Sequence, residues 1–92
     1  MNEIIETKRT TVTLDYMLSK ITKTEYTLLP ETTTTICQLF VSNGYVILGT
    51  SACVDKSKYN KMLGEKYAYE DALNKMWPLE GYLLAEELFK GI

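Results

Sequence analysis

The sequence predicts an α+β fold with a short N-terminal helix, a three-stranded antiparallel sheet and a long C-terminal helix. Three observations lead to this class. Apolar residues recur at helical spacing over 14–21, β-branched and alternating residues dominate 24–54, and helical spacing returns over 59–89. The chain has 92 residues, the size of one domain, so we expect residues 1–92 to form a single α+β unit.

The first expected element is a short amphipathic helix that fades by Lys23. Its apolar face is formed by residues at positions i, i+3, i+4 and i+7: Leu14, Met17, Leu18 and Ile21. Thr13 is a suitable N-cap, because its hydroxyl can accept a hydrogen bond from the first turn. Asp15 falls in that turn, where the helix dipole favours a carboxylate.

Three strands are expected next, and the last two of them form a hairpin around Asn43 and Gly44. The three strand-prone runs are Thr24 to Leu29, Thr33 to Ser42 and Tyr45 to about Val54. The Asn-Gly pair favours a two-residue type I′ turn, in which both residues have positive φ. That turn would pair Leu39 with Leu48. The predicted core face is then Cys37, Leu39, Val41, Val46, Leu48, Ala52 and Val54.

The same register predicts two free thiols. It pairs Cys37 with Thr50 and turns Cys53 to the opposite face of the sheet, so the two Cβ vectors do not converge. Two cysteines are also too few for a disulfide framework, and without histidine partners they are too few for a zinc site. We expect both to be small buried hydrophobic residues.

The long C-terminal helix follows Asp55, which is a candidate cap. Its apolar positions are Leu63, Tyr67, Leu73, Met76, Trp77, Leu84 and Leu88, with Ala68 and Ala72 on an adjacent stripe. Gly64 and Gly81 would allow close backbone approach. Pro78 cannot donate a backbone hydrogen bond, so the helix is expected to kink there or to break and restart.

Two helices are too little cover for a sheet with two apolar faces. Some of the surface of Ile36, Phe40 and Ile47, together with parts of the long helix, should therefore remain exposed in a single chain. We expect a homo-oligomer that buries this surface.

The composition argues against several classes of function. Ten basic and twelve acidic residues give a net charge of −2, so nucleic acid is not an expected partner. The sequence has no histidine and no glycine-rich phosphate motif. A lysine base, Lys66 or Lys75, is the remaining catalytic option. We therefore expect a protein that is not an enzyme and that needs no metal or cofactor.

The sequence also predicts a location. It contains no apolar run of about 18 residues, so we expect no membrane-spanning helix. The first ten residues, MNEIIETKRT, carry two acids and no long apolar core, so they do not have the pattern of a secretory signal. The expected location is a reducing cytoplasm.

Polar and aromatic residues along the long helix are the candidate binding site. Glu70, Asn74 and Trp77 recur at i, i+4 and i+7, in line with Tyr67. One interpretation is structural: Asn74 or Glu70 hydrogen-bonds to the hairpin backbone near residues 50–51. The other is a ligand groove at the end of the sheet or between subunits. In that groove aromatic rings would stack on a base, and amine, amide and carboxylate groups would make polar contacts: Tyr59, Lys66, Tyr67, Tyr69, Glu70, Asn74, Lys75 and Trp77.

Four segments resemble a family of small tailed-phage proteins of the gene-49/gene-66 type. They are TTTTICQL (32–39), the Asn43-Gly44 turn, GTSACVD (49–55) and GEKYAYEDALNKMWPLEGYLL (64–84). The resemblance covers about residues 12–88 and implies a phage origin. Two positions depart from the family pattern: Ala85 follows G-Y-L-L, where a basic residue is common, and Lys56 follows V-D, where proline is common.

A further similarity, to the Thoeris anti-defence proteins, implies a function. Those proteins are oligomeric sponges that sequester cyclic nucleotide-type immune signals without cleaving them. The resemblance implies that this chain binds a nucleotide-derived small molecule in the host cytoplasm. The alternative is an inhibitor or adaptor that binds a host or phage protein through the hairpin or the long helix. Sequence reasoning does not separate these two functions.

Overall fold

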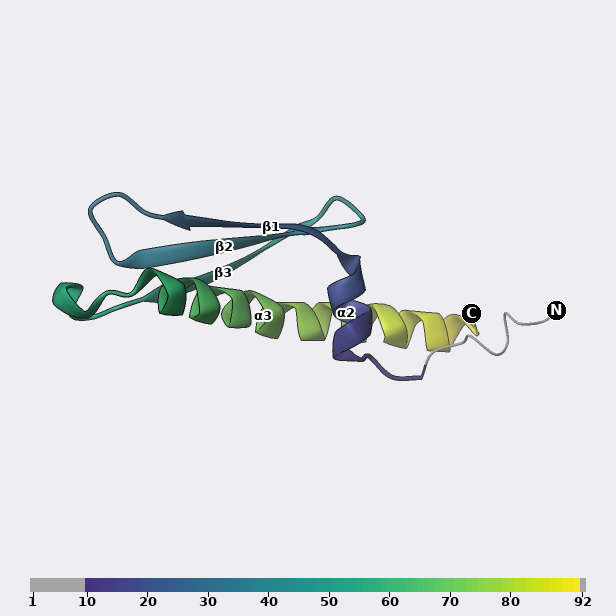
Figure 1. Cartoon of the computed structure of the whole chain (residues 1–92). Coiled ribbons are helices and arrows are strands. Elements are labelled where there is room, and N and C mark those ends of the chain that lie inside the picture. The colour runs from purple at the N-terminus through teal and green to yellow at the C-terminus, as the bar shows by residue number, and fades with distance from the viewer. Residues whose placement is uncertain (1–9, 92) are drawn as a thin grey trace.

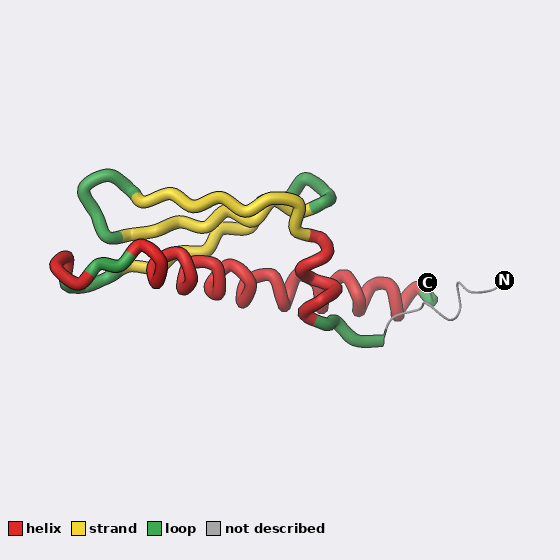
Figure 2. The backbone as a smooth tube through the Cα atoms, viewed as in Figure 1, coloured by secondary structure: helices red, strands yellow, loops and turns green. Residues whose placement is uncertain are grey.

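The computed structural model describes residues 10–91 and confirms the predicted α+β class (Figures 1 and 2). Its elements, in chain order, are α2 (Leu14–Lys20), β1 (Ile21–Leu28), β2 (Thr34–Val41), β3 (Val46–Ala52), the 3₁₀ helix η1 (Lys56–Lys58) and α3 (Lys61–Lys90). The strands form one antiparallel sheet in the order β1-β2-β3. The N-terminal segment judged not to be a secretory signal lies almost wholly outside the described residues.

Helix α2 begins as its sequence predicts. The hydroxyl of Thr13 accepts a hydrogen bond of 3.1 Å from the Tyr16 amide, so Thr13 is the N-cap. The helix ends at Lys20, and Ile21 already starts β1. Met17 is fully buried, whereas Leu14 stays exposed at the first turn.

The hairpin between β2 and β3 has a three-residue loop, so the predicted type I′ turn is wrong. The Val41 amide donates to the Tyr45 carbonyl, and the Gly44 amide donates to the Val41 carbonyl, both at 2.9 Å. Gly44 has a φ of +92°, whereas Asn43 is not among the residues with positive φ. This geometry is a tight turn followed by a single left-handed glycine, the G1 type of bulge.

The extra loop residue shifts the predicted register by one position. Leu39 pairs with Ile47, and Gln38 pairs with Leu48. Because side chains alternate across a strand, this shift exchanges the two faces of β3. Ile47 is therefore buried in the core, whereas Leu48 is 48% exposed and Val54 lies fully in solvent.

The loop geometry leads to a test at two adjacent positions. We expect Gly44→Ala to destabilise the protein by about 1–2 kcal/mol, because alanine is strained at this positive φ. Asn43→Ala should cost only about 0.5 kcal/mol, through its exposed hydrogen bond to the Tyr45 amide. Urea unfolding of both variants measures the difference. Equal and large losses of stability in the two variants would instead indicate that residues 43 and 44 both have positive φ.

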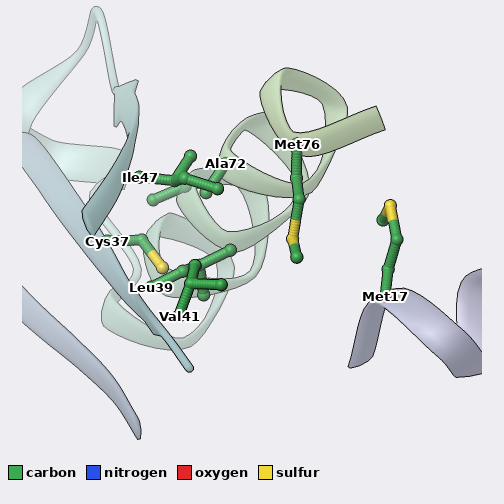
Figure 3. Close-up of a cluster of buried hydrophobic side chains, with 8 residues drawn as sticks. Met17, Cys37, Leu39, Val41, Ile47, Ala72 and Met76 are labelled. Carbon is green, nitrogen blue, oxygen red and sulfur yellow. The ribbon is translucent and has the colours of Figure 1, made fainter. Parts of the chain in front are cut away.

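The core lies between α3 and the sheet (Figure 3). The buried stripe of α3 recurs every four residues and begins with Ala68, Ala72 and Met76. These side chains meet the buried residues of the sheet: Cys37, Leu39, Val41 and Ile47. The two alanines are small, so the helix comes closest to β3 at Gly49. The close approach predicted for Gly81 is wrong, because a Cβ added there would meet open space.

Helix α3 is one continuous element with Pro78 inside it, so of the two outcomes predicted at Pro78 the break is wrong, and the kink stays a prediction. The helix is capped by Asn60, whose side chain accepts from the Leu63 amide, whereas Asp55 caps η1. Thirty residues give the helix a length of about 45 Å, against about 26 Å for an eight-residue strand. The C-terminal turns of α3 therefore project beyond the sheet (Figure 1).

One face of the sheet is uncovered within residues 10–91. Helix α3 packs against β2 and β3 on the other face. On the open face Ile36 and Phe40 are half-buried, and the Lys23 ammonium lies 4.7 Å from the centroid of the Phe40 ring. Ile47, which was also expected to be exposed, is buried on the helix side.

Both cysteines are free thiols, as predicted, although the reason differs. Cys37 on β2 pairs with Gly49 on β3, and Cys53 follows Gly49 by four residues. The two cysteines therefore lie apart in the direction of the strands. Burial raises the pKa of the Cys37 thiol to about 11. This cysteine therefore behaves as a small hydrophobic core residue.

Candidate functional site

The predicted polar and aromatic row lies on the side of α3 that faces away from the sheet. Tyr67, Glu70, Asn74 and Trp77 are all exposed, and the exposed fractions of the two aromatic residues are 51% and 37%. The sequence interpretation placed these polar groups within an apolar stripe. Because the buried stripe runs through Ala68 and its i+4 neighbours instead, the row needs no partner within its own chain.

The exposed row is longer than the sequence interpretation assumed. Leu63 precedes it, and Gly81 and Leu88 continue it, all three exposed. We call Leu63, Tyr67, Glu70, Asn74, Trp77, Gly81 and Leu88 the outer row. Their spacing alternates between four and three residues up to Gly81, and Leu88 keeps the same seven-residue phase. Such spacing is typical of a helix that packs against another helix. This spacing is present in the sequence, but the sequence interpretation placed these residues within the apolar stripe of the helix and not on its exposed side.

Of the other predicted site residues, some adjoin the outer row and others lie apart from it. Lys66 adjoins it, with its ammonium 5.7 Å from the centroid of the Tyr67 ring. Tyr69 is half-buried and packs against the core. Tyr59 lies before the helix and lines a cavity that Tyr67 shares. The structure thus groups Tyr59, Lys66 and Tyr67 near the start of α3, and it places Tyr69 apart from them.

Lys75 has a structural role at the edge of the sheet. Its ammonium donates to the Leu48 carbonyl and pairs with Asp71, both at 3.1 Å. Asp71 in turn accepts a 2.9 Å bond from the Thr50 amide, and this backbone bond, followed by the bond from Lys75, lowers the pKa of the carboxyl group. The hydrogen bonds to the hairpin backbone that were expected of Glu70 or Asn74 are therefore made by the next residues in the chain, Asp71 and Lys75. These contacts occupy two backbone groups on the outer edge of β3, the Leu48 carbonyl and the Thr50 amide.

A small cavity, which we call the end cavity, lies between the end of β3, η1 and the first turns of α3. Its volume is about 160 Å³. Typical sites for drug-sized ligands enclose roughly 300–1,000 Å³. The end cavity is lined by Thr33, Ser51, Ala52, Cys53, Lys58, Tyr59, Asn60, Leu63, Gly64 and Tyr67. It has room for one side chain, and it is too small for a nucleotide.

Most polar groups around the end cavity are already bonded within the chain. The Thr33 hydroxyl donates to the Cys53 carbonyl and accepts from the Cys53 amide. The Ser51 hydroxyl donates to the Gly64 carbonyl at 2.7 Å, and the Asn60 side chain caps α3. The cavity therefore offers mainly apolar contacts to an occupant.

The described residues hold no cluster of three or more histidine, cysteine, aspartate or glutamate side chains that could bind a metal ion. Within the same residues, no helix is long and apolar enough to cross a membrane.

Comparison with known proteins identifies the family of this chain. No curated protein and no solved structure gives a significant match. One family model matches residues 12–88, which hold the whole sheet and nearly all of α3. This match confirms the predicted resemblance to tailed-phage proteins of the gene-49/gene-66 type. The chain belongs to the phage protein (N4 Gp49/phage Sf6 gene 66) family.

Proposed function

We propose that this phage protein is a non-enzymatic binding protein that sequesters a nucleotide-type small molecule where two copies of the chain meet. One observation carries the proposal. In the middle of the outer row, the polar side chains of Glu70 and Asn74 lie between two aromatic residues, Tyr67 and Trp77, and all four face solvent. Aromatic rings of this kind can stack on a base, while the polar groups make hydrogen bonds.

A second copy is needed to make this surface into a site. A single helix face is convex, and the end cavity holds only about 160 Å³. A second hollow of about 250 Å³, lined by Glu31, Thr32, Thr33, Lys56 and Tyr59, is wide open to solvent and does not enclose a ligand. A ligand of nucleotide size would therefore be enclosed only between two chains. The uncovered face of the sheet and the exposed outer row both favour self-association.

The chemistry of this site would be binding without turnover. Lys66 beside Tyr67 supplies a positive charge for a phosphate, whereas Lys75 is engaged with Asp71. The sequence has no histidine to act as a general base. Sequestration of a cyclic nucleotide-type immune signal in the host cytoplasm is the proposed role.

A second candidate function is an inhibitor or adaptor that binds a host or phage protein. The end cavity favours it, because its volume and apolar lining suit one side chain of a partner. On this interpretation the outer row would contact the partner directly, with its aromatic residues as anchors.

Thermal-shift measurements with a panel of cyclic oligonucleotides and cyclic ADP-ribose isomers test the first function. We expect a ligand-dependent rise in Tm and intact ligand after the complex is heated. Trp77→Ala should weaken binding roughly tenfold or more, because the stacking contact is lost. Tyr45→Ala is the matched control, since Tyr45 is also an exposed aromatic residue but lies at the hairpin.

The outcomes separate the candidate functions. Recovery of a converted ligand would contradict the non-enzymatic proposal. Equal weakening by Trp77→Ala and Tyr45→Ala would place the ligand away from the outer row. If no member of the panel raises the Tm, the protein-binding function replaces the sponge.

A further inference from the structure

The two ends of α3 carry complementary features. At its N-terminal end the end cavity is a mainly apolar space of about 160 Å³. At its C-terminal end the Phe89 side chain is 87% exposed, on turns that project beyond the sheet. We propose that two copies pair antiparallel along their outer rows and that Phe89 of each copy enters the end cavity of the other. This inference rests on the part of the proposed function in which two copies meet along α3.

The outer row has the spacing of a helix–helix seam. Steps of four and three residues keep the row on one line of the helix from Leu63 to Gly81, and Leu88 falls one heptad later. Its ends are apolar, with Leu63 and Leu88, and its middle is polar, with Glu70 and Asn74. Apolar ends can hold the two chains together while the polar middle stays available to a ligand.

Charge decides the direction of pairing. Residues 56–66 contain four lysines and one glutamate. At the other end of α3, Glu80 is buried against Lys20, so the remaining charges of residues 79–90 are those of Glu86, Glu87 and Lys90. A parallel pair would set like charges together and place Glu70 against the partner's Glu70. An antiparallel pair instead sets the basic start of α3 beside the acidic end of the partner's helix, which is electrostatically complementary.

The antiparallel register follows from matching the apolar ends. When Leu63 lies opposite the partner's Leu88, Glu70 lies opposite the partner's Gly81 and Asn74 opposite the partner's Trp77. A Cβ added at Gly81 would meet open space within its own chain. The glycine therefore leaves a gap in the middle of the seam, beside the polar and aromatic groups proposed to bind the ligand.

The same register brings Phe89 to the end cavity. Phe89 follows Leu88 directly, so its backbone lies one residue beyond the level of Leu63. Helical side chains lean toward the N-terminus of their own helix, which carries the Phe89 ring back toward Leu63 and Gly64, and both of these line the cavity. At about 100° per residue, Phe89 and Gly64 lie on the same side of the outer row. A two-fold axis normal to the plane of the two helices keeps them on that side. The volume also fits, since an apolar cavity of about 150 Å³ accommodates benzene.

Light scattering coupled to size-exclusion chromatography tests the interface. We expect a mass of about 21 kDa for the native chain, twice its 10.5 kDa. Phe89→Ser should weaken the dimer at least tenfold. Met62→Ser is the control, since Met62 is exposed on the first turn of α3 outside the outer row. Circular dichroism checks that each variant is folded.

Cross-linking tests the direction. In a Cys53→Ser background, the double variant Leu63→Cys/Leu88→Cys should form a covalent dimer on oxidation. Leu63→Cys alone should not, because an antiparallel pair keeps the two copies of residue 63 apart. About 37 Å of helix separates positions 63 and 88 within one chain, so an internal bond cannot form.

Each contrary outcome overturns the inference. A monomeric native chain, self-cross-linking of Leu63→Cys, or dissociation by Met62→Ser but not by Phe89→Ser would do so. Thermal shifts on the same samples separate this result from the proposed function. A monomer that binds a cyclic nucleotide would refute the interface and leave ligand binding intact. An antiparallel dimer that binds none would refute the ligand and leave the interface.

Discussion

Gly49→Ala is expected to destabilise the protein by about 3 kcal/mol or more, because among the described glycines an added methyl group meets its closest contacts there. Gly49 lies on β3 where α3 comes closest. A Cβ there would be 2.7 Å from the Ala72 Cβ and still closer to the Ala68 carbonyl oxygen and the Ala72 amide nitrogen. These are mainly backbone atoms of a helix, so they cannot rotate away as a flexible side chain can. The helix would have to move off the sheet.

A matched glycine gives the control for this prediction. Gly81→Ala introduces the same methyl group on α3, where it meets no atom of its own chain within 4 Å. Because Gly81 lies on the outer row, the two variants are compared at a protein concentration at which the chain is monomeric. Alanine also has the higher helix propensity, so this variant should be more stable by about 0.5–1 kcal/mol. Urea unfolding followed by circular dichroism measures both. Similar stability of the two variants would mean that α3 does not approach β3 as described.

Lys20→Met is expected to cost about 3 kcal/mol at neutral pH. The Lys20 ammonium pairs with Glu80 at 2.8 Å, and Glu80 is only 4% exposed. Methionine keeps most of the side-chain volume but removes the charge. A carboxylate would then stay buried without its partner, and this pair is one of the few links between α2 and α3. Thermal unfolding at pH 7 measures the loss.

The double variant Lys20→Met/Glu80→Leu is the control for that interpretation. Replacing both charges with apolar side chains leaves no buried charge, so stability should return to within about 1 kcal/mol of the native chain. If the double variant is as unstable as Lys20→Met, the loss comes from packing at Lys20 and the ion pair is not its cause.

The same pair predicts a dependence on alkaline pH. Burial lowers the pKa of Lys20, but the hydrogen bond and the charge of Glu80 outweigh it, so the pKa lies above its ordinary 10.5. The pair therefore contributes its full stability below about pH 10.5 and loses it as the pH rises through the folded-state pKa. Between pH 10 and 12 the native Tm should fall more than that of Lys20→Met.

The register of the hairpin shows where sequence reasoning stopped. Asn43-Gly44 correctly marked the turn, but the dipeptide is compatible with a two-residue loop and with a three-residue loop ending in glycine. Alternation alone did not choose between them, because both faces of β3 carry apolar residues. The choice depends on which residue fits beneath α3, and only Gly49 is small enough to face Ala68 and Ala72.

The candidate site shows a similar division. The sequence identified the residue types and their helical spacing, including Tyr67, Asn74 and Trp77. It did not reveal that Lys75 is engaged by Asp71 and the Leu48 carbonyl, because those contacts join positions far apart in the chain. A groove at the end of the sheet was one of the two places expected, and Tyr59 and Tyr67 line the end cavity there. The rest of its lining was not predicted, because it comes from separate segments of the chain.

The amino-acid sequence by itself determined the kind and order of the elements, the free thiols and the phage family, because periodicity, turn residues and local motifs are properties of neighbouring positions. Only the tertiary structure decided which face of β3 is buried, which side of α3 stays open and where a cavity forms. Those features depend on how closely a helix and a sheet can approach, and that distance is set by pairs of residues that meet only after the chain has folded.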